Sequence, residues 1–218
     1  MKRHIVCLGD SNTHGYCADP ADCADGSLRR FNESERWTCR LQAALGEDFL
    51  VLEEGLPGRT TVFDDPVEES LSALPYLYPC LMSHAPVSLL VVMLGTNDTK
   101  ERLGANACAI GKGLRRLVRK AQSIDCWAAA AQPSDCRPAR HRKGSGAISR
   151  GPGDGTGLRG KIPAPARPVP GGRRRNPLPL SGRQCLGLAH NPIDFMHLTR
   201  ESHARLAAAL AERIPTLF

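Results

Sequence analysis

Three short apolar runs, each followed by a turn that contains glycine, constrain the fold of this chain more than any other feature. They cover residues 4–8, 49–52 and 88–94, and the last contains Leu89-Leu90-Val91-Val92-Met93. Continuous apolar runs of this length are typical of strands buried on both faces of a parallel sheet. We therefore predict three parallel strands, whose following loops meet at one edge of the sheet.

Helical patterns lie between and after these runs. Apolar residues recur at three- and four-residue spacing over residues 35–45 and 110–121, and a last helix is predicted over 200–214 with Thr199 as its N-cap. On the second helix the basic residues fall opposite the apolar stripe, which predicts a solvated face. Strands that alternate with helices predict an α/β fold with a parallel sheet between helical layers.

The alternation stops over residues 128–190. This segment holds eleven glycines, nine prolines and twelve Lys/Arg against two Asp/Glu, so it carries +10 while the rest of the chain carries −3 of the formal +7. Such a composition buries too little apolar surface to offset the entropy lost on ordering. The basicity of the chain therefore belongs to this segment, and we expect a single domain over 1–218 that the segment interrupts.

Three explanations of residues 128–190 remain open. The abrupt exit from a helical pattern and the abrupt return at Pro192-Ile193-Asp194 favour a pair of compensating frameshifts in a GC-rich gene. In that case another reading frame of the DNA encodes an apolar strand and a helix there. A disordered insert is the second explanation. A basic arm that binds nucleic acid is the third and least favoured, because the segment has no aromatic residues for base stacking.

Composition argues against several other classes of protein. Nine cysteines are scattered without a Cys-x-x-Cys pair, which favours reduced thiols over disulfides or a metal site. No apolar run reaches the length of a membrane span. The apolar stretch near the N-terminus is only four residues long, too short for a signal peptide. We therefore expect a cytoplasmic protein with no membrane partner.

Polar residues with catalytic potential follow the predicted strands. Ser11 follows the first strand, where its hydroxyl can act as a nucleophile and its backbone N–H can bind an oxyanion. Taken alone, this serine equally suits a helix N-cap or a phosphate-binding turn. Gly58 and Asn97 follow the other two strands and can add N–H donors at the same edge. Donors from separate loops around one serine are what acyl transfer requires.

An acid and an imidazole come together near the C-terminus. Asp194 and His197 are three residues apart and precede the last predicted helix. One short loop can therefore hold both, so that the carboxylate orients the imidazole and the other ring nitrogen faces the serine. The second histidine of this region, His203, lies within the helix, and we expect it to be exposed.

Four segments of the chain together resemble the SGNH (GDSL-type) hydrolases, in particular their arylesterase and acyltransferase branch. The resemblance covers residues 1–127 and about 191–218 and rests on Gly9-Asp10-Ser11, the loop 55–61, Gly95-Thr96-Asn97-Asp98 and Asp194-x-x-His197. It implies a flavodoxin-like three-layer fold, no metal or organic cofactor, and a small-molecule ester as partner. It leaves open whether the protein forms a homo-oligomer.

The resemblance also implies roles for individual residues. Ser11, His197 and Asp194 would form a catalytic triad, and the Ser11 and Gly58 N–H groups with the Asn97 side chain would form an oxyanion hole. Pro57 has no N–H of its own, which is why the backbone donor is assigned to Gly58.

The implied reaction is hydrolysis of short-chain carboxylic esters, or acyl transfer from them, through an acyl-enzyme. The fourth and fifth strands of the family are not legible in residues 128–190. The alternative is a catalytically dead or binding-only protein whose middle segment fails to position the Asp194–His197 loop.

Overall fold

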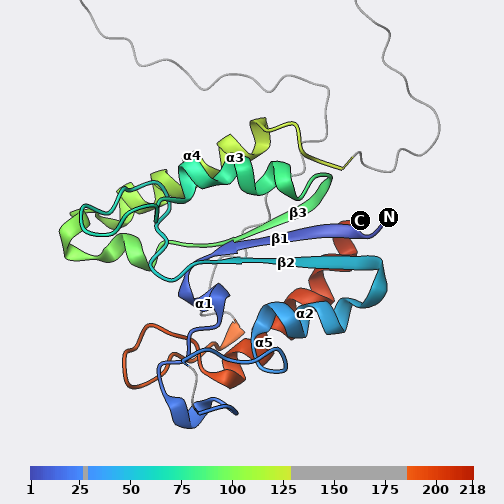
Figure 1. The fold of residues 1–218 in the computed structure, drawn as a ribbon, viewed down its shortest axis with the longest axis horizontal. Helices are drawn as coiled ribbons and strands as arrows, with labels where there is room; N and C mark the ends of the chain where they lie inside the picture. The colour runs from blue at the N-terminus through green and yellow to red at the C-terminus, as the bar shows by residue number, and fades with distance from the viewer. Residues whose placement is uncertain (27–28, 129–185) are drawn as a thin grey trace, which may run out of the picture. The chain divides into compact units, whose positions relative to one another are not determined.

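The computed structural model describes residues 1–26, 29–128 and 186–218, all of which fall within one compact unit. Its sheet consists of β1 (Arg3–Gly9), β2 (Phe49–Gly55) and β3 (Val87–Met93), which are parallel and lie in the order β2-β1-β3 (Figure 1). The three predicted strands are thus confirmed, and each begins and ends within three residues of its predicted bounds. This strand order is that of the doubly wound, flavodoxin-like fold.

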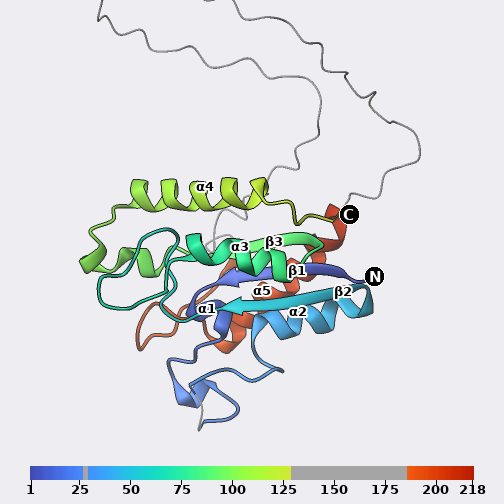
Figure 2. The ribbon, with the colours of Figure 1, turned by 45° about the horizontal axis from the view of Figure 1, so that its top comes forward.

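Helices cover both faces of the sheet (Figures 1 and 2). One face carries α3 (Ala73–Ser83) and α4 (Ala107–Ser123), and the other carries α2 (Trp37–Leu45) and α5 (Arg200–Arg213). Side chains of a strand point alternately to the two faces. Accordingly, Val6 and Leu8 of β1 pack with α3 and α4, whereas Ile5 and Cys7 pack with α2 and α5. The predicted α/β class, with its helical layers on a parallel sheet, is confirmed.

The remaining described elements are short. A four-residue helix, α1 (Ser11–His14), follows β1 directly. Single 3₁₀ turns are η1 (Pro20–Asp22), η2 (Gly46–Asp48), η3 (Asn97–Thr99), η4 (Glu101–Leu103) and η6 (Ile214–Leu217).

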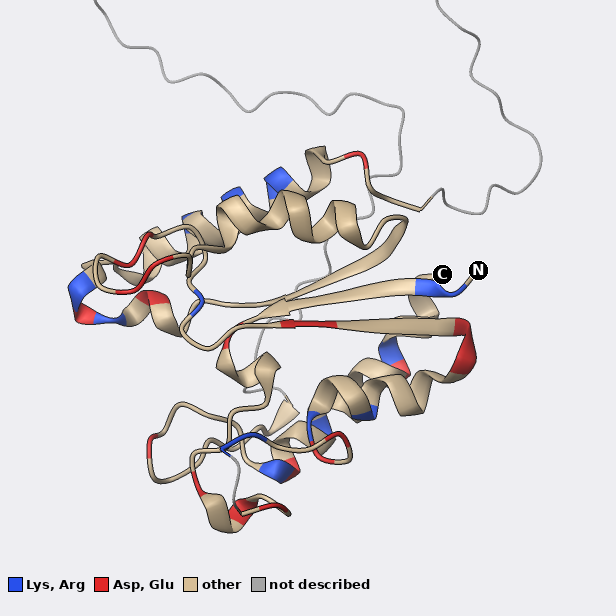
Figure 3. Cartoon of the chain, viewed as in Figure 1, with Lys and Arg blue, Asp and Glu red and all other residues tan. Residues whose placement is uncertain are grey.

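The helices differ from their predicted bounds for local reasons. The helix expected from residue 35 begins at Trp37, because Arg36 before it has an extended backbone, with φ of −72° and ψ of 142°. The N-cap predicted for the last helix is present, with the Thr199 hydroxyl 3.2 Å from the Ser202 nitrogen. The basic residues of α4 are exposed along its outer side (Figure 3), as predicted; they are Arg115, Arg116, Arg119 and Lys120.

Residues 129–185 lie outside the described residues, and with them most of the segment 128–190 and the three explanations proposed for it. The chain that follows α4 still returns to the sheet. Val87 pairs in parallel with Trp127, its N–H donating to the Cys126 carbonyl at 2.7 Å and its carbonyl accepting from the Ala128 N–H at 2.8 Å. Residues 126–128 thus lie beside β3, where a fourth strand would begin.

Two further findings concern the classes that composition argued against. Within residues 1–26, 29–128 and 186–218, no helix is both long and apolar enough to cross a membrane. The seven cysteines of the same ranges are all free thiols. Five of the seven are buried, namely Cys7, Cys17, Cys23, Cys80 and Cys126.

Candidate active site

The carboxyl ends of the three strands lie side by side, and the polar loops follow from there. Gly9, the last residue of β1, is level with Gly55 of β2 and with Met93 of β3. A Cβ on Gly9 would overlap the Thr13 side chain, and one on Gly55 would overlap the His14 backbone. These glycines therefore allow α1 to pack directly against the strand ends, which places Ser11 at this edge.

His197 lies within hydrogen-bond distance of both Ser11 and Asp194, one on each ring nitrogen. The Nε2 atom of His197 is 2.8 Å from the Ser11 Oγ, and its Nδ1 atom is 2.6 Å from an Asp194 carboxylate oxygen. Ser11 and His197 are 186 residues apart in the chain. The structure thus brings together the three residues that sequence reasoning selected, although residues 129–185 separate their two segments.

The surroundings of Asp194 favour its ionised form. Burial alone would raise its pKa, but hydrogen bonds from the His197 side chain and from the Met196 and His197 N–H groups outweigh burial and hold the pKa below its ordinary value. An ionised carboxylate only accepts hydrogen bonds, so the Nδ1 of His197 donates. In neutral His197 the unprotonated Nε2 then faces the Ser11 hydroxyl, as a general base requires.

The loops after β2 and β3 are joined beside this edge. The Asn97 amide, which is buried, donates from Nδ2 to the Arg59 carbonyl at 3.1 Å. Arg59 follows Gly58, whose φ of +85° is a conformation that suits glycine. The Gly9 carbonyl accepts both the Leu56 N–H and the Arg59 Nη1, each at 3.1 Å. Gly58 and Asn97 are thus held in one network with the end of β1.

Several residues around the site were not singled out by sequence reasoning. The Tyr16 ring packs against the His197 imidazole with 4.4 Å between centroids. Asp98, next to Asn97, is fully buried and accepts the Thr61 N–H at 3.0 Å. Asn12 is also fully buried and bonds to the backbone on either side of His197. Tyr16 carries no sequence signal, whereas Asn12 could have been selected as a polar residue directly after Ser11.

The expectation that His203 is exposed is wrong. His203 is 0% exposed, and its Nδ1 accepts the N–H of Trp37, the first residue of α2, at 3.1 Å. Arg36, the N-cap residue, makes no side-chain capping bond, so His203 of α5 caps α2 across the helix pair. Burial lowers the pKa of His203 to about 3, assisted by the charge of the nearby His197. The imidazole is therefore neutral.

This buried histidine predicts a specific loss of stability in acid. In the unfolded chain the pKa is about 6.5, so between pH 6.5 and 3 the unfolded state binds more protons and stability falls as pH falls. At pH 5 the loss relative to pH 8 is expected to be about 2 kcal/mol. Urea unfolding of the wild type and of His203→Gln, which keeps an acceptor but does not titrate, measures the difference. Equal losses in the two proteins would contradict the assignment.

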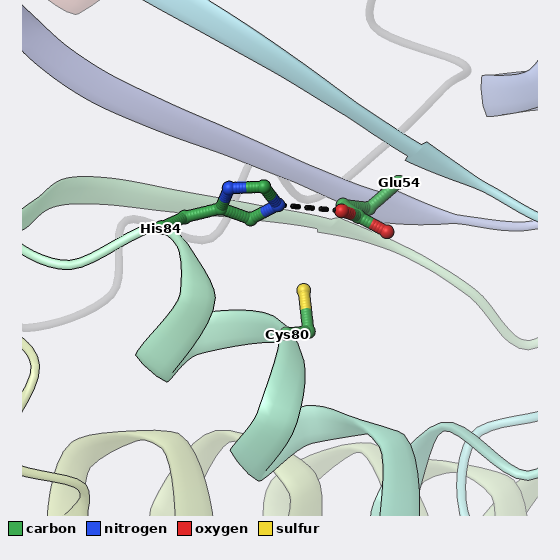
Figure 4. A group of neighbouring side chains, drawn as sticks. All are labelled: Glu54, Cys80 and His84. Carbon is green, nitrogen blue, oxygen red and sulfur yellow. Dashed lines mark hydrogen bonds and ion pairs between the residues drawn. The ribbon is translucent and has the colours of Figure 1, made fainter.

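A second cluster of ionisable groups lies between β2 and α3. Figure 4 shows Glu54 facing His84 and Cys80. A carboxylate oxygen, a ring nitrogen and the sulfur of these three residues all lie within 4.8 Å of one another. One Glu54 oxygen is 2.6 Å from His84 Nε2, and the other accepts from the Tyr76 hydroxyl at 2.6 Å. Burial raises the pKa of Cys80 to about 12, so it remains a thiol. Both carboxylate oxygens are engaged, so we interpret the cluster as a tie between strand and helix and assign no metal to it.

Comparison with known proteins identifies the family. Residues 7–149 match the model of the GDSL-like lipase/acylhydrolase family. The native M. smegmatis aryl esterase is 28% identical over 99% of this chain and 100% of its own, with a TM-score of 0.65. An alignment to the inhibitor-bound form of M. smegmatis aryl esterase is 41% identical but spans 54% of each chain, with a TM-score of 0.49.

A second solved structure of similar fold is Est24, a carbohydrate acetylesterase from Sinorhizobium meliloti. It is 26% identical to this chain over 100% of both, with a TM-score of 0.65. A comparison with curated proteins found no match. The family model covers well over half of the sequence, and the strand order and polar loops agree with it. The chain belongs to the GDSL-like lipase/acylhydrolase family of SGNH hydrolases.

Proposed function

We propose that the protein is a serine esterase that hydrolyses short-chain carboxylic esters, or transfers their acyl group to an alcohol, through an acyl-enzyme on Ser11. The observation that carries this proposal is the series of contacts from Asp194 through His197 to the Ser11 hydroxyl, at 2.6 and 2.8 Å. The ester substrate class is supported by the two similar structures, one of an aryl esterase and one of a carbohydrate acetylesterase.

In the first half of the reaction Ser11 Oγ attacks the ester carbonyl carbon while His197 Nε2 takes the hydroxyl proton. Asp194 stabilises the imidazolium that forms and keeps Nδ1 pointing toward itself. The tetrahedral intermediate collapses when the C–O bond to the alcohol breaks and His197 returns the proton to the leaving oxygen. Water or a second alcohol then repeats these steps on the acyl-enzyme, which releases the acid or a new ester.

The negative charge of the tetrahedral intermediate requires N–H donors. Asn97 has two amide hydrogens, and the Arg59 carbonyl engages one of them. That bond fixes the plane of the amide and leaves the second hydrogen for the oxyanion. We assign the other two donors to the Ser11 and Gly58 backbone N–H groups, which belong to the loops after β1 and β2.

A covalent label tests the proposal directly. A phosphonate ester with a p-nitrophenol leaving group is expected to release one equivalent of p-nitrophenol per chain and to leave its phosphonyl group on Ser11. Peptide mass spectrometry locates the adduct, and Ser11→Ala is expected to remain unlabelled. A binding-only protein would release no p-nitrophenol, and a label on another residue would contradict the assignment of the nucleophile.

A further inference from the structure

One buried side chain joins the nucleophile segment to both sides of His197. The Asn12 Oδ1 accepts the Leu198 N–H at 2.8 Å, and the Asn12 Nδ2 donates to the Met196 carbonyl at 3.4 Å. The Met196 carbonyl belongs to the peptide group that precedes His197, and the Leu198 N–H belongs to the one that follows it. The Asn12 carboxamide therefore bridges the two peptide groups from which the His197 side chain projects.

We infer that Asn12 is a positioning residue for His197, which sets the distance between the imidazole and the Ser11 hydroxyl. This inference rests on the proposed function. Ser11 and Asn12 are consecutive in the chain. The bonds from the Asn12 side chain to the histidine loop therefore fix the position of His197 relative to the backbone that carries Ser11.

The backbone of the histidine loop needs such support. Phe195, between Asp194 and His197, has a φ of +54°, a conformation that is unfavourable for a residue with a side chain. Its side chain is 79% exposed and so provides little packing to hold the loop in place. Residues in such conformations persist only where surrounding contacts fix them. Two backbone hydrogen bonds also fix this loop, in addition to those from Asn12. The Phe195 N–H donates to the Asn191 carbonyl at 2.8 Å, and the Asn191 N–H donates to the His197 carbonyl at 2.7 Å.

Asn12 is itself held from the other side. Its N–H donates to the Asp10 carboxylate at 3.0 Å, and its carbonyl accepts the Trp37 indole N–H at 3.1 Å. Trp37 opens α2, and its own N–H is capped by His203 of α5. The backbone of Asn12 is thus attached to a buried network that includes both helices of this face, so its side chain projects from a fixed position.

Removal of this side chain should affect the chemical step more than substrate binding. Proton transfer from Ser11 requires His197 Nε2 to stay within hydrogen-bond distance, and a displacement of about 1 Å can cost roughly 100-fold in rate. We expect Asn12→Ala to lower kcat for p-nitrophenyl acetate by about 10- to 100-fold, with KM changed less than about threefold. The rate of phosphonate labelling at Ser11 should fall in parallel.

Thr38→Val is the matched control for general loss of stability. Thr38 is also fully buried, but its hydroxyl is hydrogen-bonded to Glu53 of β2. We expect its Tm to fall while kcat stays within about twofold of the wild type. Equal losses of kcat in the two variants would overturn the inference, and so would an Asn12→Ala protein with wild-type kcat.

A second variant keeps the test valid if Asn12→Ala does not fold. Asn12→Asp has the same shape and keeps the acceptor for Leu198, but when ionised it turns an oxygen toward the Met196 carbonyl instead of donating to it, so we expect kcat at pH 8 to fall here as well. Wild-type kcat in this variant would overturn the inference. Ser11→Ala distinguishes the two levels of failure: an active Ser11→Ala protein contradicts the proposed function, whereas an inactive one beside a fully active Asn12→Ala contradicts only the role of Asn12.

Discussion

Ser11→Ala is expected to lower kcat/KM for p-nitrophenyl acetate by at least about 10⁴-fold. The substitution removes the only atom that can form the acyl-enzyme in the proposed mechanism, while it leaves the backbone N–H of residue 11 in place. Ser11 is 5% exposed, and loss of its hydroxyl removes one hydrogen bond, to His197, so the fold should persist. Steady-state kinetics and a thermal melt of the same preparation measure both quantities.

Ser83→Ala is a suitable control for this variant. Ser83 ends α3 just before β3 begins, at the opposite edge of the sheet from Ser11. Its replacement should leave kcat/KM within about twofold. The serine mechanism would have to be abandoned if Ser11→Ala kept a well-folded, fully active protein.

The second large effect is expected at Asn97, the proposed oxyanion donor. Asn97→Ala should lower kcat by about 10²- to 10³-fold with a small change in KM, because the lost donor acts on charge that develops only in the transition state. The same substitution leaves the Arg59 carbonyl without its Asn97 donor, so a stability loss of about 1–3 kcal/mol should accompany it.

Asn106→Ala separates the two consequences of this substitution. Asn106 is the N-cap of α4, and its side chain accepts the Ala109 N–H at 2.9 Å. Loss of this cap should cost about 1 kcal/mol of stability without any change in kcat. An Asn97→Ala protein with unchanged kcat, or one in which KM carries the whole effect, would argue against transition-state stabilisation by Asn97.

The strands and the polar loops were predictable because each has a local signal. Buried parallel strands are continuous apolar runs, and strand-end loops must meet at one edge, so Ser11 and Asn97 could be selected from their places after the strands. Asp194 and His197 could be selected because they lie three residues apart just before the last helix. The family resemblance then supplied a role for each. Local patterns could not show that His197 Nε2 lies 2.8 Å from the Ser11 Oγ, because these residues are 186 positions apart in the chain.

The features that sequence reasoning missed depend on contacts between distant segments. Helix α3, which contains Pro75 and Pro79, was not predicted from the sequence, and it forms with its apolar face packed on the sheet. His203 was expected to be exposed because a polar residue in a helix usually is, but it is buried and accepts the Trp37 N–H at the first turn of α2. The role proposed for Asn12 is of the same kind, since its partners lie at the other end of the chain.

The central place of β1 has a consequence for how the site forms during synthesis. β1 leaves the ribosome before either of its neighbours, and Ser11 leaves with it, whereas His197 and α5 follow much later. A nascent chain that has not yet reached residue 194 therefore carries the proposed nucleophile, Ser11, without its proposed base, His197. In refolding experiments the return of esterase activity would require the contact between Ser11 and His197, which lie far apart in the sequence. Activity should therefore return later than the helical signal in circular dichroism.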